Sequence, residues 1–166
     1  MQFSRDAIAR KIVDEIGADG PDALGTTVMG SIVTGVALAV GDDDDVEYLG
    51  ASLRRSEEVL AVQVGVFTAR TIITVEAMLS TENGNSDIVT RVHSRSDLER
   101  LEITGGTPST TTDDFVEWPG RFTVRAVYRD GLELIIPMSD ANTPQKRNSV
   151  WTILSGLRGD LGRTGS

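Results

Sequence analysis

Apolar residues recur at helical spacing at both ends of this chain and alternate with polar residues between the two ends. Near the N-terminus, Ile8, Ile12 and Ile16 fall on one stripe of a helix, and Ser4 is placed to cap it. The mixed charges around these residues are not those of a signal peptide. The pattern predicts an amphipathic helix over residues 4–16.

The next segment is uncharged for nineteen residues, from Ala23 to Gly41. Its strongly apolar part, Val28 to Val40, is shorter than the roughly 20 residues that span a membrane, and no Lys or Arg flanks it. It predicts a buried helix, so that residues 1–41 form an arm of two helices. Such a helix needs cover on all sides, either from the chain's own core or from a partner. The second alternative predicts an oligomer interface of Val28, Ile32, Val33, Val36 and Val40.

Four consecutive aspartates, Asp42 to Asp45, follow this helix. Their spacing is not that of a calcium-binding loop, and solvated side chains are the ordinary meaning of such a run. We expect residues 42–56 to be an acidic linker between the helical arm and a β-rich body.

The body, residues 57–161, begins with two segments in which every second residue is apolar or β-branched. One carries Leu60, Val62, Val64 and Val66, and the other carries Thr71, Ile73, Val75, Ala77 and Leu79. Asn83-Gly84 and Asp130-Gly131 are pairs typical of tight hairpin turns. The last hairpin places Phe122, Val124, Ala126 and Tyr128 on one face, and Leu132, Leu134 and Ile136 return on it. These segments predict six or seven antiparallel strands.

Helical spacing returns after Pro144. Apolar residues from Val150 to Leu161 predict a closing helix capped at Asn148 or Ser149, and residues 162–166 are expected to be a frayed tail. The predicted fold class is α+β. It consists of a helical N-terminal arm, then a curled antiparallel sheet or small barrel that the C-terminal amphipathic helix closes.

Three quoted segments, in this order before the closing helix, carry a resemblance to a known family. They are SEEVLAVQVGVFTARTIITVEA, HSRSDLERLEI and VYRDGLELIIP, within about residues 57–161. The chain resembles the bacterial pleckstrin-homology-like domain over this range. The resemblance implies a protein-interaction or assembly role. Lipid-binding members of the wider fold have a basic cluster near the first hairpin, where this chain has only Arg70, so no phosphoinositide binding is expected.

The net charge and the cysteine content of the chain limit the kinds of partner and site that are expected. The formal charge is −9, which disfavours nucleic acid and anionic lipid as partners. The chain has no cysteine, which excludes disulfides, thiolate metal sites and a cysteine nucleophile. A cytoplasmic location is consistent with this composition.

Few residues are candidates for a catalytic, metal-binding or partner-binding role. His93 lies in a strand pattern, and a lone strand histidine is usually structural; Ser94, Ser96 and Asp97 are too close in sequence to form a catalytic relay. No catalytic residue, metal site or cofactor is predicted. An acidic partner is one interpretation of Arg121, Arg125 and Arg129, although their strand spacing suits separate salt bridges with partners such as Glu133. Trp118 is either an exposed anchor for a partner or a cover for the end of the sheet.

These patterns favour a non-enzymatic interaction or assembly module that binds a protein partner or a second copy of itself. The first alternative is a small-ligand carrier or enzyme with an apolar pocket in a cupped sheet, for which His93, Tyr128 and Trp118 are the candidates. The second alternative, by analogy with other small acidic dimers, is a secretion or phage-assembly chaperone.

Overall fold

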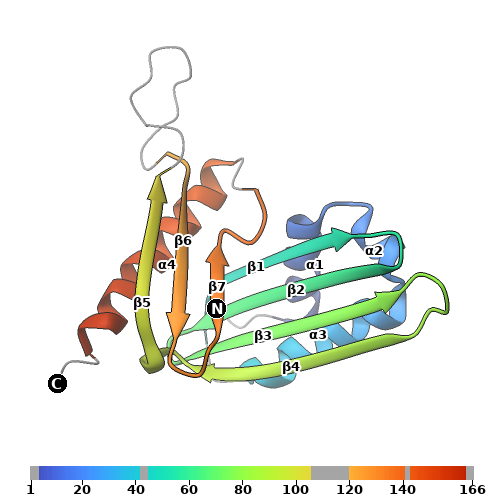
Figure 1. Ribbon diagram of the computed structural model, residues 1–166, viewed down its shortest axis with the longest axis horizontal. Coiled ribbons are helices and arrows are strands. Elements are labelled where there is room, and N and C mark those ends of the chain that lie inside the picture. Colours follow the sequence, from blue (N-terminus) through green and yellow to red (C-terminus); the bar gives the residue numbers. More distant parts are fainter. Residues whose placement is uncertain (1–3, 42–44, 106–119, 141–142, 164–166) are drawn as a thin grey trace, which may run out of the picture. The chain divides into compact units, whose positions relative to one another are not determined.

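The computed structural model describes residues 4–41, 45–105, 120–140 and 143–163 (Figure 1). The described residues form an α+β fold with two separate antiparallel sheets. The chain divides into two compact units, residues 1–93 and residues 94–166, called unit 1 and unit 2 below. Each has its own sheet. The expected single curled sheet or barrel is therefore wrong, and so is one body running from 57 to 161.

Unit 1 consists of three helices followed by a four-stranded sheet. The helices are α1 (Arg5–Ile16), α2 (Gly20–Leu24) and α3 (Thr26–Val40). The strands, in the order β1-β2-β3-β4, are β1 (Val46–Arg55), β2 (Val59–Thr68), β3 (Thr71–Ser80) and β4 (Ser86–Ser94). The cap predicted for α1 is confirmed, because the Ser4 hydroxyl accepts a hydrogen bond from the Ala7 amide.

The helices of unit 1 do not form a separate arm. Ile8 and Ile12 of α1 lie in one core with Ile32 of α3 and with Val64 and Val75 of the sheet. An amphipathic helix and a one-sided apolar sheet each need such cover. The predicted apolar faces of β2 and β3 are confirmed by the burial of the side chains from Leu60 to Val66 and from Ile73 to Ala77 at alternate positions.

The predicted linker is also corrected. Most of residues 42–56 form β1, which pairs antiparallel with β2 and buries Leu49 and Ala51 in the same core. Strand pairing and burial at these positions outweigh the flanking charges. Asp42 to Asp44 lie outside the described residues.

Unit 2 has a three-stranded sheet covered by the last helix. A short 3-10 helix, η1 (Arg95–Asp97), precedes β5 (Leu98–Gly105), β6 (Phe122–Tyr128) and β7 (Glu133–Ile136), which pair in that order. The final helix is α4 (Pro144–Arg163), which packs on β5 and η1 and begins one turn before the predicted cap. The predicted apolar face of the last hairpin is confirmed by the burial of Val124, Ala126, Tyr128, Leu134 and Ile136.

Candidate interaction surface

The inner side of α3 belongs to the core of unit 1. The five residues of the predicted oligomer interface, Val28, Ile32, Val33, Val36 and Val40, are all buried within this same chain. Burial in the chain's own core was the other alternative of the sequence analysis. Because a partner cannot reach these side chains while they fill the core, any contact through α3 has to use its other side.

The outer side of α3 carries no charge at all. Its exposed residues recur at helical spacing, and Leu38 among them exposes 75% of its surface. Surface helices usually present charged or strongly polar residues to water, but none of the 15 residues of α3 is charged. The exposed positions after Thr26, the first residue of the helix, are Thr27, Gly30, Ser31, Thr34 and Leu38, and they are called the α3 outer face below.

Strand β4 runs beside this helix and forms one edge of the sheet (Figure 1). Gly35 is the point of close approach, since a Cβ atom added there would collide with the hydroxyl of Thr90 on β4. Two residues further along β4, Val92 exposes 55% of its surface. The far side of β4 pairs with no other described strand. The α3 outer face and this edge of β4 together are called the α3–β4 surface.

The opposite edge of the sheet is built differently. Strand β1 has a β-bulge between Val46 and Tyr48, and it carries the charged residues Glu47, Arg54 and Arg55. Helix α1 also packs against it. Bulges, charges and helical cover all discourage strand addition at an edge. Strand β4 carries the charged residues Asp87 and Arg91 but contains neither Pro nor Lys, and α1 packs on β1 rather than on β4, so the two edges of one sheet differ in how they are covered.

The predicted arginine row does not converge on one ligand. Arg125 donates to Glu133 at 2.7 Å and to Glu102 at 3.0 Å on the neighbouring strands, so the expected cross-strand salt bridges are present. Both hydrogen bonds raise the pKa of the Arg125 guanidinium, and the one to Glu133 contributes the most. Arg121 and Arg129 lie just outside the two ends of β6. Trp118 lies outside the described residues.

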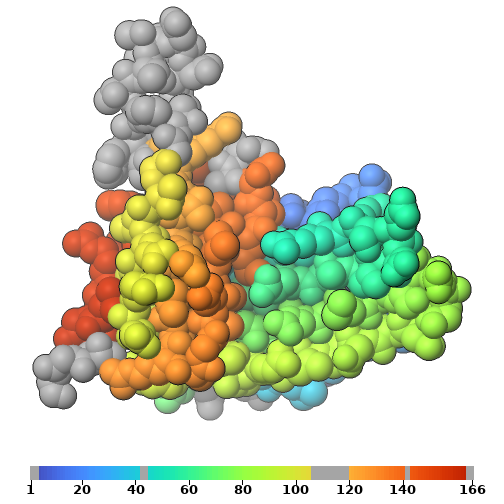
Figure 2. Space-filling model, in the orientation of Figure 1, coloured from blue at the N-terminus to red at the C-terminus, as the bar shows by residue number. Residues whose placement is uncertain are grey.

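The residues predicted for a ligand pocket lie in different units. The Nε2 atom of His93 lies 3.2 Å from the Thr74 hydroxyl in unit 1, whereas Tyr128 is buried in unit 2. Unit 1 has a shallow hollow of about 250 Å³ on the face of its sheet away from the helices. Figure 2 shows this face of the strands, coloured teal to yellow-green, turned toward the viewer. The hollow is lined mainly by Ser52, Arg54, Gln63, Glu76 and Met78.

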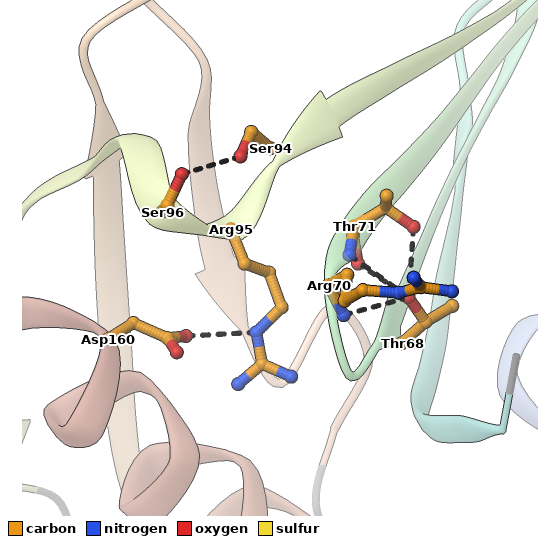
Figure 3. Close-up of polar contacts among 7 residues, drawn as sticks. All are labelled: Thr68, Arg70, Thr71, Ser94, Arg95, Ser96 and Asp160. Carbon is orange, nitrogen blue, oxygen red and sulfur yellow. Dashed lines mark hydrogen bonds and ion pairs between the residues drawn. The ribbon is translucent and has the colours of Figure 1, made fainter. Parts of the chain in front are cut away.

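Unit 2 holds a buried ion pair that the sequence did not indicate. The Nε atom of Arg95, in η1, lies 2.9 Å from a carboxylate oxygen of Asp160, in α4 (Figure 3). Burial raises the pKa of the Tyr128 hydroxyl; the charge of Arg95 opposes this shift and that of Asp160 adds to it. That hydroxyl has no hydrogen-bond partner among the described residues. Asp160 falls among polar residues in the sequence, and only its tertiary partner reveals its burial.

The other polar contacts in Figure 3 are local. The Ser94 and Ser96 hydroxyls lie 2.7 Å apart beside η1. In the turn between β2 and β3, the Thr68 hydroxyl accepts hydrogen bonds from the amides of Arg70 and Thr71. Contacts of this kind stabilise a tight turn.

The described residues contain no cluster of three or more His, Asp or Glu side chains that could hold a metal ion. None of the described helices is both long and apolar enough to cross a membrane. Comparison of the chain with protein-family models, with curated proteins and with solved structures finds no match. The proposals below therefore rest on the geometry of the chain itself.

Proposed function

We propose that this protein is a non-enzymatic interaction module that assembles by self-association through the α3–β4 surface. One observation carries the proposal: an uncharged outer helix face, with Leu38 exposed by 75%, lies along an unpaired strand edge. Exposed apolar residues that are grouped together are typical of interaction sites. The proposed contact uses the side of α3 opposite to the one that the sequence suggested.

The charge distribution of the chain favours a second copy of itself as the partner at this surface. In a two-fold symmetric dimer the same patch meets itself. Most patches of a chain with a net charge of −9 would then bring like charges together. The α3 outer face has no charge, and the small side chains at Gly30, Ser31 and Thr34 allow two helices to approach closely.

The test is the substitution Leu38→Glu, measured by light scattering on a sizing column. In a symmetric contact it buries two like charges at the interface, so we expect the dimer to dissociate while circular dichroism shows an unchanged fold. Ile135→Glu is the matched control, because Ile135 is a similarly apolar residue with 56% exposure in unit 2. A dimer that survives Leu38→Glu as well as it survives Ile135→Glu contradicts the proposal.

Two expectations from the sequence belong to this proposal. The resemblance to the pleckstrin-homology-like domain over about residues 57–161 is supported by the order of the antiparallel strands β2 to β7 followed by a helix. A cytoplasmic location is supported by the lack of cysteine. The ligand-carrier alternative has less support, because the hollow on the sheet is smaller than the roughly 300–1,000 Å³ of most ligand pockets.

A further inference from the structure

We propose that the β4 strands of two copies pair antiparallel, so that two four-stranded sheets become one continuous sheet. This inference rests on the proposed self-association and specifies its geometry. Strand β4 spans nine residues and lies at the end of the strand order, so its outer backbone groups pair with no described strand. An open strand of this length that contains neither Pro nor Lys is a template for strand addition.

The direction of the β4 side chains follows from their contacts. Arg91 forms an ion pair with Glu76 at 2.9 Å, and Glu76 lies on the sheet face away from the helices. Thr90 meets α3 at Gly35, and Ile88 packs on the helix-side core. Because side chains alternate along a strand, Asp87 and Val89 lie on the same face as Arg91.

Charge complementarity within β4 selects a register. Antiparallel pairing of β4 with itself about Val89 sets Asp87 of one copy opposite Arg91 of the other, and this happens twice because of the two-fold symmetry. Opposite charges that face each other across two strands are favourable. Asp87 is exposed and has no ion-pair partner among the described residues, while Arg91 is half exposed beside Glu76. A second copy thus supplies the partner that Asp87 lacks.

The same register brings the two α3 helices together. On the helix side of the joined sheet, Ile88 lies opposite Thr90 of the second copy, and Val92 lies opposite Ser86. Helix α3 runs alongside β4 in each copy. The α3 outer faces of the two copies therefore approach each other across the symmetry axis. Strand pairing and helix contact therefore cover the two parts of the α3–β4 surface at once.

Single cysteines test this register, because the natural chain has none. In the proposed pairing the two Val89 Cα atoms lie about 4.5–5.5 Å apart, which is within reach of a disulfide. We expect Val89→Cys to form a covalent dimer under mild oxidation, seen on a non-reducing gel. The matched control is Val92→Cys. That residue is more exposed, yet the two copies of it lie six residues apart along the paired strands, roughly 20 Å, so it should remain uncrosslinked.

Three other outcomes of these experiments would overturn the register, the strand pairing or both proposals. A dimeric chain in which Val92→Cys cross-links as readily as Val89→Cys overturns the strand pairing and leaves the proposed function standing. Cross-linking at Thr90→Cys but not at Val89→Cys overturns the register that pairs Asp87 with Arg91. If the unmodified chain is a monomer at every concentration tested, both proposals fail, and the open edge has to be assigned to a different occupant, such as an extended peptide of another protein.

Discussion

The guanidinium of Arg95 is held by Asp160 in the interior of unit 2, where the two residues are only 4% and 8% exposed. The pair joins η1 to α4, two segments that lie 65 residues apart in sequence. Removal of the carboxylate from a buried pair takes away the charge that faces the guanidinium, which is far more costly than the loss of an exposed pair. This pair is therefore a specific anchor of the last helix.

The substitution Asp160→Ala should lower the free energy of unfolding of unit 2 by about 3–5 kcal/mol. The double substitution Arg95→Met with Asp160→Leu should recover most of that loss, because no charge remains buried. Urea unfolding followed by tryptophan fluorescence checks this, since both tryptophans lie in residues 94–166. Glu133→Gln, in the exposed network around Arg125, is the control and should have little effect. Equal effects of Asp160→Ala and Glu133→Gln would contradict the account.

We expect Tyr128 to make unit 2 sensitive to alkaline pH. Burial raises the pKa of its hydroxyl above the unfolded value of about 10. The contribution of this group to stability is therefore fully present below about pH 10 and is lost as the pH rises toward the folded-state pKa. Tyr128→Phe removes that dependence. It should also equal or exceed the natural chain in stability at neutral pH, since the hydroxyl it removes is buried without a partner among the described residues.

The measurement is the free energy of unfolding of both chains at pH 8 and above pH 10, again by urea and tryptophan fluorescence. The natural chain should lose stability relative to Tyr128→Phe over this range. The other tyrosine, Tyr48, is present in both chains, so its titration cancels in the comparison. Parallel loss of stability in the two chains would show that Tyr128 does not cause the dependence.

At the scale of elements, the contact between α3 and β4 depends on a glycine. A Cβ atom at Gly35 would collide with Thr90, whereas one at Gly30 would meet nothing nearby. Gly30→Ala should raise the free energy of unfolding of unit 1 by about 1 kcal/mol, because Ala favours a helix over Gly. Gly35→Ala should gain less than this or lose stability. Thermal unfolding followed by circular dichroism gives the comparison, and equal gains at both positions would refute the close contact.

Local patterns in the sequence predict most elements of this fold. Alternation identified the buried faces of β2, β3 and β6, and helical spacing with a Ser4 cap identified α1. Asn83-Gly84 marked the turn before β4, where Gly84 has a positive φ of 69°. These features depend on neighbours in the chain, and the sequence displays them directly.

The rest depends on contacts between distant segments. Strand β1 has alternating apolar residues at Leu49, Ala51 and Leu53. The acidic run before it and the arginines at its end obscure this pattern in the sequence. Only the pairing with β2 identifies the segment as a strand. Alternation also does not say which strands pair, so it did not reveal that β4 ends one sheet and β5 begins another. For the candidate site, the sequence identified α3 as unusual, but which side of it faces the core depends on tertiary packing.

At the scale of the whole molecule, a net charge of −9 restricts how two copies can meet. A symmetric contact needs a patch that carries no net charge and that gains from burial. The α3–β4 surface meets both requirements through its uncharged helix, through exposed Leu38 and Val92, and through the opposite charges of Asp87 and Arg91. We therefore expect the natural chain to self-associate through this surface.

The most direct test is the solution mass of the full, unmodified chain, determined by sedimentation equilibrium over a wide range of concentrations. The single chain has a mass of 17.8 kDa. We predict a species of twice that mass that dissociates on dilution. A mass of 17.8 kDa at every concentration would contradict the self-association of this protein.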